Sequence, residues 1–251
     1  MKLEVNNISK TFKNQNKHKK VLENISFTLE EGQFVTLLGP SGCGKTTMLS
    51  IIAGFEKSDS GMVKLDGDII NGPNPDRAFV FQNYALFPWM TVKDNILFPM
   101  KQMKIPDNEQ RQRLEYLLEI SKLKGHEELY SHQISGGMKQ RTALVRALAS
   151  KPKVLLMDEP LGALDLMMRQ SLQMEIENIW REEKITALMV THDVDEAVYL
   201  SDKVILMSTN AGKIVYELEN NLPRPRNRYC EQYKDYCMKL VQKISEKGVI
   251  V

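Results

Sequence analysis

The chain has 251 residues, 42% hydrophobic and 26% charged, and its 34 Lys and Arg against 32 Asp and Glu leave a net charge of +2. This is the composition of an ordinary globular protein, and the charge is too small to indicate nucleic-acid binding by itself. The three cysteines, Cys43, Cys230 and Cys237, show no C-x-x-C spacing and predict neither a disulfide framework nor a zinc site. The first ten residues are polar, and no apolar run approaches the ~20 residues that span a bilayer, so we expect a cytoplasmic chain without a signal peptide.

The first half of the chain opens with strand patterns. The alternation from Val21 to Leu29 predicts a half-buried strand, preceded by a polar loop at residues 13–20. The apolar run Phe34–Leu38 then breaks into glycines and a helix-like stretch, Lys45–Ala53. Asp66-Gly67 follows as a hairpin turn between two short strands.

A helical pattern extends from Thr91 to Ala149, and strands and helices alternate after it. The expected strands lie at residues 154–157, 186–190 and 204–207. The expected helices are Leu166–Glu183, Val194–Leu200 and residues 228–245. Such alternation favours a parallel sheet covered by helices, with the earlier helical block inserted between two of its strands.

Residues 39–46, Gly-Pro-Ser-Gly-Cys-Gly-Lys-Thr, match the phosphate-binding pattern G-x-x-x-x-G-K-[ST] between an apolar strand and a helix. Glycines let the backbone turn its N–H groups towards an anion, and the helix N-terminus adds roughly half a positive charge. Lys45 would reach the β- and γ-phosphates and Thr46 would bind Mg²⁺. The alternative is an accidental glycine-rich turn. The candidate nucleotide contacts are Gly39, Pro40, Ser41, Gly42, Cys43, Gly44, Lys45, Thr46 and Thr47.

Asp158 and Glu159 directly follow an apolar strand. Two adjacent carboxylates at the end of a buried strand are costly unless a cation or hydrogen bonds compensate them. Asp158 is therefore predicted to bind the magnesium ion, and Glu159 to act as general base towards a water molecule. The alternative is a pair of acids in the first turn of a helix, where the helix dipole favours them.

The sequence resembles the ABC ATPase family, through several motifs in the family's order. Residues 134–141, Ile-Ser-Gly-Gly-Met-Lys-Gln-Arg, are similar to the signature L-S-G-G-Q-x-Q-R. Gln82 matches the family's Q-loop, residues 154–159 its Walker B strand, residues 161–165 its D-loop and His192 its switch histidine.

The resemblance covers residues 3–222 and implies a RecA-like P-loop α/β core with an N-terminal antiparallel β subdomain and an inserted α-helical subdomain. It implies a nucleotide-binding domain at residues 1–222, the helical subdomain at about 84–150 and a C-terminal helical extension at 223–251. Phe12 lies where the family keeps an aromatic ring that stacks on adenine. It would look the same as a core aromatic of the first strand.

The resemblance also implies roles for individual residues. The implied catalytic residues are Glu159, His192, Lys45 and Gln82. The implied magnesium ligands are Thr46, Gln82 and Asp158. His192 would hydrogen-bond the γ-phosphate and hold Glu159 and the attacking water in place.

In the family, the signature faces an ATP molecule held by a second protomer. The residues expected to act across that interface are Ser135, Gly136, Gly137 and Asp165. Two departures from the signature are visible: Ile134 replaces Leu, and Met138 replaces Gln and cannot donate a hydrogen bond. We expect lost contacts to the sugar, not lost catalysis.

Residues 158–165, Asp-Glu-Pro-Leu-Gly-Ala-Leu-Asp, resemble those of importer cassettes. The absence of a fused membrane segment agrees with this resemblance. Residues 72–77, 79–82 and 87–89 resemble those of the nitrate/sulfonate/taurine branch of importers, which includes carriers of thiamine precursors. The implied partners are a second ATPase subunit in a homodimer, membrane permease subunits and an extracytoplasmic solute-binding protein, with no nucleic acid. The chain would lie peripherally at the cytoplasmic face of the membrane.

Residues 82–90, which begin at Gln82, are expected to receive the permease. Most of this segment is apolar, which is unusual for a surface connection. Trp89 and Phe87 are the predicted anchors, since buried aromatic residues dominate such interfaces. The alternative is that they pack inside the helical subdomain.

Two other functions remain open at this stage. A soluble ABC-type ATPase acting on nucleic acid or ribosomes would bind those partners and no membrane protein. A nucleotide-binding regulator that does not hydrolyse ATP would show no rate that depends on Glu159.

Overall fold

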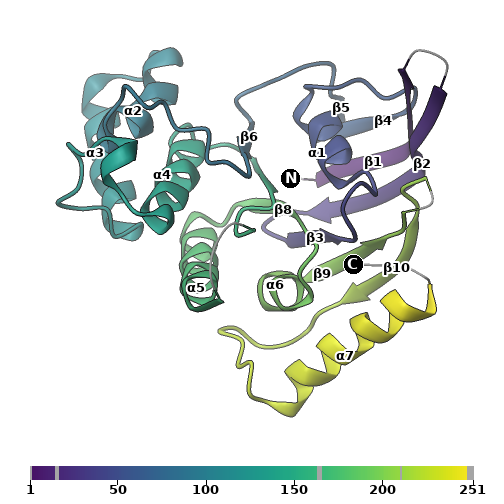
Figure 1. Ribbon diagram of the computed structural model, residues 1–251. Coiled ribbons are helices and arrows are strands. Elements are labelled where there is room, and N and C mark those ends of the chain that lie inside the picture. The colour runs from purple at the N-terminus through teal and green to yellow at the C-terminus, as the bar shows by residue number, and fades with distance from the viewer. Residues whose placement is uncertain (1, 15–16, 163–165, 210, 248–251) are drawn as a thin grey trace. The chain divides into compact units, whose positions relative to one another are not determined.

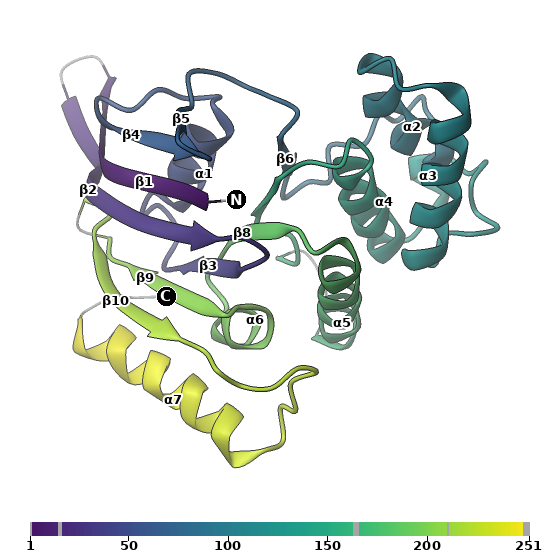
Figure 2. The ribbon, with the colours of Figure 1, turned by 180° about the vertical axis from the view of Figure 1, so that it is seen from behind.

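The computed structural model describes residues 2–14, 17–162, 166–209 and 211–247. These fall into two compact units (Figures 1 and 2). Unit 1 comprises Met1–Asn74 and Thr186–Val251, and unit 2 comprises Pro75–Ile185. Among the described residues, no helix combines the length and the apolar character needed to cross a membrane.

Unit 1 contains an antiparallel sheet in the order β2-β1-β4-β5. Its strands are β1 (Lys2–Asn14), β2 (Lys17–Glu30), β4 (Ser60–Leu65) and β5 (Asp68–Ile69). The predicted hairpin turn is confirmed: Asp66 and Gly67 have φ values of 54° and 89°, the positive values that a type I′ turn requires. The loop predicted at residues 13–20 is wrong for most of its length. Cross-strand pairs such as Thr11 with Lys20 extend both strands into it, because backbone pairing does not depend on polar side chains.

Unit 1 also contains a group of mostly parallel strands in the order β10-β9-β3-β8. These are β3 (Phe34–Leu38), β8 (Thr186–Thr191), β9 (Lys203–Met207) and β10 (Ile214–Glu219). β3 pairs in parallel with both β8 and β9, and all five of its residues are buried, as expected for a continuous apolar run. β10 was not predicted. It runs antiparallel to β9, and its side chains are half-buried or exposed, so its apolar pattern is weak.

The described part of unit 1 contains the helices α1 (Lys45–Ala53), α6 (Val194–Leu200) and α7 (Glu231–Glu246). Both ribbon views show α7, in yellow, lying beside α6 and β10, and α6 and α7 are in contact (Figures 1 and 2). The C-terminal helix begins three residues later than the predicted start at residue 228. The domain boundaries at residues 222 and 223 stay predictions.

Unit 2 combines two parallel strands with four α-helices and a short 3₁₀-helix. The strands are β6 (Arg77–Val80) and β7 (Val154–Asp158). The helices are α2 (Val92–Gln102), α3 (Asp107–Ile120), η1 (Ser131–Gln133), α4 (Gly136–Leu148) and α5 (Leu166–Glu183). α2 packs on both α3 and α4. The mixed α/β character of the chain therefore agrees with the predicted fold class.

A largely buried ion pair links α3 to α5. The Arg113 guanidinium donates to both carboxylate oxygens of Glu183, at 2.9 and 2.5 Å, and to the Leu148 carbonyl at 2.7 Å. The two side chains are only 11% and 10% exposed. Burying such a pair costs free energy, because both charges lose their contact with water. Removing one partner costs more, because the other charge then stays buried without compensation.

We predict that Arg113→Ala lowers the free energy of unfolding by about 3–5 kcal/mol, because Glu183 would stay buried without its cation. Lys93→Ala is the control, since Lys93 and Glu128 form an exposed pair whose side chains are 42% and 75% accessible. It should cause no measurable change in urea unfolding. Equal unfolding curves for the two variants would contradict the importance given to the Arg113 pair.

Candidate functional site

The phosphate-binding pattern forms the loop between β3 and α1 in unit 1. A Cβ atom on Gly39 would lie 2.7 Å from the Met207 carbonyl oxygen, and one on Gly44 would lie 2.8 Å from the Val21 carbonyl oxygen. Gly44 also has a φ of 103°, which L side chains rarely adopt. The glycines are therefore required where the loop backbone passes closely over its neighbours, and the contacts of the loop with phosphate stay a prediction.

Lys45 folds back over this loop. Its side chain is buried, and Nζ donates to the carbonyl oxygens of Gly39 at 2.7 Å and Pro40 at 3.0 Å. Thr46 is exposed and Thr47 is half-buried on the first turn of α1. The ammonium group thus lies against the loop, next to the place where the predicted phosphates would bind.

The N-terminus of α1 is suited to an anion. Its N-cap, Gly44, offers no side-chain hydrogen bond, and the first turn contains no acidic residue. By contrast, α2, α4 and α6 each begin with a side-chain cap, from Thr91, Ser135 and Asp193 respectively. A phosphate group bound here would complete the first turn of α1 in the way that a capping side chain does elsewhere.

The remaining loop residues differ in exposure. Ser41 and Gly42 are exposed, whereas Pro40 and Cys43 are buried. The Cys43 Sγ atom lies 3.0 Å from the position that a Cβ on Gly39 would take. Cys43 therefore fills the space beneath the loop as a small apolar side chain.

His192 lies at the carboxyl end of β8, next to the start of this loop. Leu38 pairs with Thr191, and the Gly39 N–H donates to the Thr191 carbonyl oxygen at 3.3 Å. The His192 side chain is exposed. The motif histidine and the phosphate loop are thus brought together within unit 1 by the parallel pairing of β3 and β8.

The residues on both sides of His192 are held by side-chain hydrogen bonds. The Thr191 hydroxyl donates to Glu196 Oε2 at 2.6 Å and accepts from the Asp193 N–H at 3.0 Å. Asp193 Oδ1 in turn accepts from the Glu196 N–H at 3.1 Å and caps α6. Sequence reasoning missed these supports, although Asp193 before an apolar helical stretch is a recognisable N-cap signal.

Phe12 lies on β1 with 41% of its surface exposed, so it is not a core aromatic. The Lys10 ammonium lies 5.2 Å from its ring centroid. Lys10 is anchored by Glu56 Oε1 at 2.7 Å, and this hydrogen bond raises the pKa of Lys10 above its usual value. The Phe12 ring is accessible for stacking, and its contact with adenine stays a prediction.

In unit 2, the acidic pair lies at the carboxyl end of β7. Asp158 ends the strand and Glu159 follows it with a φ of 42°, and both side chains are half-buried. The next helix, α5, begins only at Leu166, so the alternative of two acids in a first helical turn is wrong. The uncommon positive φ fixes the direction of the chain at the predicted base.

Gln82 and Glu159 come together over Gly162. The parallel pairing of Val80 with Met157 places the residues that follow β6 and β7 at the same sheet edge. A Cβ on Gly162 would lie 3.7 Å from Glu159 Oε2 and 3.8 Å from Gln82 Nε2. Two of the predicted catalytic residues are therefore neighbours in unit 2. Asp165, also predicted as a nucleotide contact, lies outside the described residues.

The signature motif opens α4. Ser135 is its N-cap, and its hydroxyl accepts from the Met138 N–H at 3.3 Å. The helix begins at Gly136, because this cap satisfies its first turn. Ser135 is exposed, Gly136 is half-buried, and Gly137 is buried against α5, with Met168 Sδ 3.6 Å from its Cβ position.

The segment after Gln82 has an unusual backbone. Tyr84 and Ala85, which follow each other, have φ values of 63° and 46°. Arg146 of α4 donates to both of their carbonyl oxygens, at 3.0 and 2.7 Å, and lies over the Phe87 ring. Burial lowers the pKa of Arg146. A cation 61 residues away along the chain thus stabilises this strained turn, and no local pattern predicts such a contact.

An apolar groove of about 530 Å³ lies beside this segment within unit 2. Its aromatic lining residues are Phe79, Phe81, Phe87 and Phe98. The Phe87 ring is half-buried and lies 4.7 Å from Phe98 and 5.5 Å from Trp89. Trp89 is 69% exposed. The alternative that both aromatics pack inside the helical unit is therefore wrong for Trp89.

Comparison with known proteins agrees with these motifs. The family described as "ABC transporter" matches residues 22–162. The aliphatic sulfonates import ATP-binding protein SsuB of Bacillus cereus is 44% identical over 250 residues, which cover 100% of this chain and 98% of the relative. The nitrate import ATP-binding protein NrtD of Synechococcus elongatus is 42% identical over 224 residues, which cover 88% of this chain and 82% of the relative. Among solved structures, the dimeric post-hydrolysis state of the ATP-binding cassette MJ0796 with ADP and Pi matches with a TM-score of 0.75. The two sequences are 30% identical, and the match covers 86% of this chain and 98% of that chain.

We predict that Gly44→Ala lowers the free energy of unfolding by about 2–4 kcal/mol, since it combines an unfavourable φ with a clash against β2. Gly42→Ala is the matched control, because Gly42 has a φ of 79° but open space around its Cβ position. Gly42→Ala should lower the free energy of unfolding, measured by chemical denaturation, by about 1–2 kcal/mol. A loss at Gly42 as large as that at Gly44 would show that the close approach to Val21 does not matter.

Proposed function

Because this chain belongs to the ABC transporter family, we propose that its hydrolysis of ATP powers uptake of a small solute through separate permease subunits. The fold is that of the ABC ATPases: a RecA-like P-loop core, an N-terminal antiparallel β subdomain and a helical subdomain. The observation that carries the proposal is the similarity over the whole chain to a relative named for sulfonate import. The solute belongs to the nitrate, sulfonate, taurine or thiamine-precursor classes, and its identity depends on the partners.

ATP binding uses the loop of unit 1. The backbone N–H groups around Gly42 and the uncapped start of α1 receive the phosphates, and Lys45 exchanges its loop carbonyls for phosphate oxygens. Phe12, accessible on β1, stacks on the adenine. His192, at the end of β8, hydrogen-bonds the γ-phosphate.

Hydrolysis needs a group that accepts a proton from water. Glu159 performs this task, because its Oε2 atom and Gln82 Nε2 lie 3.7 and 3.8 Å from one point, the Cβ position of Gly162, and Gln82 can orient the same water. The half-buried setting limits competing solvent around the carboxylate. Proton transfer from the water to Glu159 then accompanies attack of the water oxygen on the γ-phosphorus, and the bond to the bridging oxygen breaks to release ADP and phosphate.

The donor set fits a magnesium ion. Thr46, Gln82 and Asp158 offer a hydroxyl, an amide and a carboxylate oxygen, the hard ligands that Mg²⁺ prefers alongside water and phosphate. Among the described residues, no group of three or more His, Cys, Asp and Glu side chains is placed to hold a metal. When bound, the ion would neutralise charge on the phosphates.

A second copy of this chain completes each nucleotide site. Ser135, Gly136 and Gly137, at the start of α4, face the ATP of the other copy, together with Asp165. Support comes from the dimeric state of the similar cassette that contains ADP and Pi. The resulting homodimer clamps two nucleotides.

Permease subunits dock in the apolar groove of unit 2, beside residues 82–90. Phe87 lines the groove, and its ring lies 5.5 Å from the exposed ring of Trp89, the kind of anchor that dominates protein interfaces. The chain is thereby held at the cytoplasmic face of the membrane. An extracytoplasmic solute-binding protein joins through the permease.

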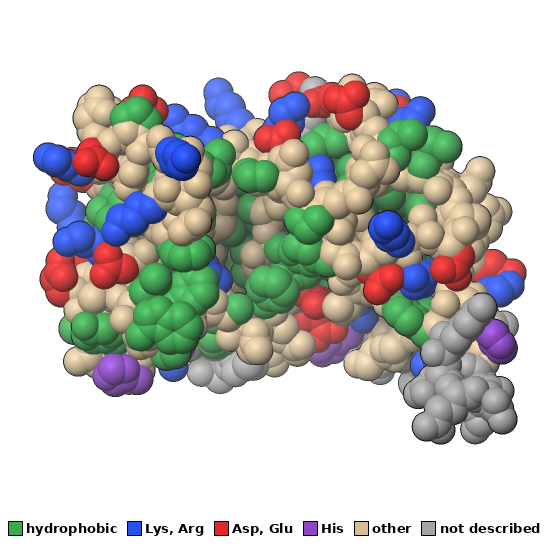
Figure 3. Space-filling view, turned by 90° about the horizontal axis from the view of Figure 1, so that it is seen from above, with side chains coloured by type: hydrophobic (Ala, Val, Ile, Leu, Met, Phe, Trp, Pro, Cys, Tyr) green, Lys and Arg blue, Asp and Glu red, His purple; other side chains and the backbone are tan. Residues whose placement is uncertain are grey.

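The alternative of an ATPase that acts on nucleic acid or ribosomes is less well supported. The relatives are named as import proteins. On the face shown in Figure 3, acidic and basic side chains are interspersed, and neither sign forms a continuous field. A nucleic-acid surface needs such a basic field.

Glu159→Gln tests the hydrolytic role. We expect the ATPase kcat to fall by about 100-fold or more, because an amide cannot accept the proton from water. Phosphate release from the purified protein measures this, and ATP binding should remain. Glu182→Gln, an exposed acid of α5, is the control and should keep normal activity. Near-normal turnover in Glu159→Gln would refute the assignment and favour a regulator that does not hydrolyse ATP.

Trp89→Ala tests the docking surface. The membrane-bound fraction of the tagged chain, expressed in cells that supply the permease, should fall by about tenfold or more, as for the loss of an interface anchor. The ATPase rate of the purified subunit should stay within about twofold, since the ring is exposed. Tyr229→Ala, which removes another exposed aromatic from unit 1, should change neither. Unchanged membrane association of Trp89→Ala would place the docking site elsewhere.

A further inference from the structure

The segment after β10, residues 220–240, folds back onto α6, the helix that follows His192. We call this segment the C-terminal strap. α6 spans only seven residues, from Val194 to Leu200, and a helix of this length has no stability of its own. Its position therefore depends on what holds its two ends.

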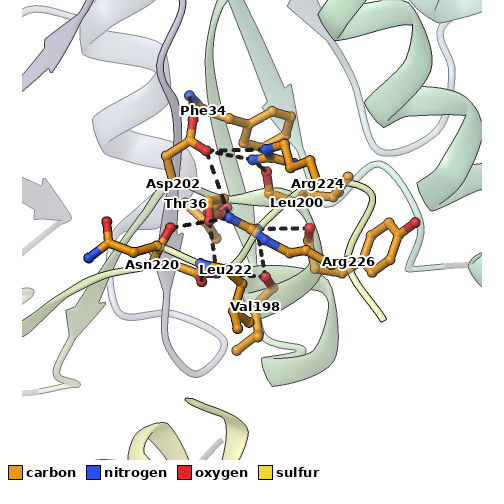
Figure 4. Close-up of polar contacts among 12 residues, drawn as sticks. Phe34, Thr36, Val198, Leu200, Asp202, Asn220, Leu222, Arg224 and Arg226 are labelled. Carbon is orange, nitrogen blue, oxygen red and sulfur yellow. Dashed lines mark hydrogen bonds and ion pairs between the residues drawn. The ribbon is translucent and has the colours of Figure 1, made fainter. Parts of the chain in front are cut away.

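The last turn of α6 is held by two arginines of the strap. Arg226 Nη1 donates to the carbonyl oxygens of Val198 at 2.7 Å and Tyr199 at 2.8 Å, and Arg224 Nη2 donates to Leu200 at 2.6 Å (Figure 4). These are carbonyl groups at the end of the helix, which cations stabilise most. Arg226 is 5% exposed. Such burial indicates a built cap, not a surface contact.

The same cluster reaches the strand that leads to the phosphate loop. Asp202 Oδ1 lies 2.7 Å from Arg224 Nη2, and Asp202 Oδ2 accepts from the Phe34 N–H at 2.9 Å (Figure 4). Asn220 Nδ2 also donates to the carbonyl oxygens of Val198 and Ser201, at 2.8 and 3.0 Å. The C-terminal end of α6 is thus tied to the start of β3 through the strap.

The first turn of α6 is held by a second pair of strap residues. The Tyr233 hydroxyl lies 2.6 Å from Asp195 Oδ1 and 3.1 Å from the Asp195 carbonyl oxygen, and Arg228 Nε donates to Asp195 Oδ2 at 3.2 Å. The Arg228 guanidinium also lies 3.6 Å from the centroid of the Tyr199 ring. Tyr233 is 3% exposed, and burial together with Asp195 raises its pKa well above the usual value. Tyr233 therefore donates its proton in this contact over the whole working range of pH.

We infer that the C-terminal strap positions His192 for hydrolysis by fixing both ends of α6, with Tyr233 and Arg228 as positioning residues. The inference rests on the proposed role of His192 at the γ-phosphate. Asp195, which both residues hold, is three positions after His192. The hydrogen bonds among Thr191, Asp193 and Glu196 connect that turn rigidly to the histidine. A displacement of α6 therefore moves His192, and small misplacements of a reacting group cost large factors in rate.

The competing explanation is that the strap only stabilises unit 1. The two explanations differ in where the loss appears. A purely stabilising strap changes the unfolding temperature and leaves the turnover of folded protein alone. A positioning strap lowers kcat while the KM for ATP changes little, because the contacts described for Tyr233 and Arg228 hold α6, the helix that follows His192.

The test compares Arg228→Gln/Tyr233→Phe with the control Tyr229→Phe in the full-length protein. Tyr229 belongs to the same segment but is 87% exposed. We expect the double variant to lower kcat by about tenfold, as a small displacement of a reacting group does, with the KM for ATP within about twofold. The control should match the parent. If the double variant does not fold, Tyr233→Phe alone, which removes one oxygen atom, should lower kcat by about threefold.

The same substitutions in a His192→Ala background separate the outcomes. If the strap acts through His192, they should change the remaining kcat by less than about twofold there, since coupled residues are not additive. A full tenfold loss in that background, or no loss in the parent, overturns the inference alone. If His192→Ala itself leaves kcat unchanged, the proposed role of the histidine fails, and the inference fails with it.

Discussion

The phosphate loop imposes the constraint on which the rest of the structure depends: backbone N–H groups must face an anion, with no side chain in the way. Gly39 and Gly44 permit this because the loop passes within about 3 Å of neighbouring backbone oxygens, where a Cβ atom would clash. The start of α1 has no side-chain cap, and a phosphate group bound there would satisfy its first turn. A fully buried β3 holds this costly loop in place.

The predicted catalytic side chains lie on residues that follow strands. In unit 1, His192 follows β8, and in unit 2, Glu159 and Gln82 follow β7 and β6. Because parallel strands end at one edge, Glu159 and Gln82 become neighbours although they are far apart in sequence. The polar groups can be kept near one another because the strands beneath them are apolar and rigid. Their orientation then depends on supports such as the Thr191, Asp193 and Glu196 bonds around the histidine.

Features encoded locally were predictable from the sequence. The helices at Lys45–Ala53 and Leu166–Glu183 have the predicted bounds, because a glycine-rich loop and a long amphipathic pattern define them. Predictions failed where pairing with a segment far away in the sequence determines the local structure. β10 is half-exposed and forms only because β9 offers an edge, and residues 13–14 and 17–20 are extended by cross-strand pairing despite their polarity. The same holds within the site: the Arg146 contacts that hold the turn after Gln82 link residues far apart, and no motif describes them.

This division has a physical reason. Residues that touch a nucleotide must present fixed chemistry at fixed spacing, so they form short motifs. Residues that hold those motifs in position need only reach them, and any element nearby can supply them. Tyr233 reaches Asp195 across 38 residues, and Arg226 reaches the end of α6 across 28. A seven-residue helix next to the switch histidine cannot orient itself. The C-terminal strap is therefore part of the hydrolytic apparatus although it contains none of the motifs that identify the family.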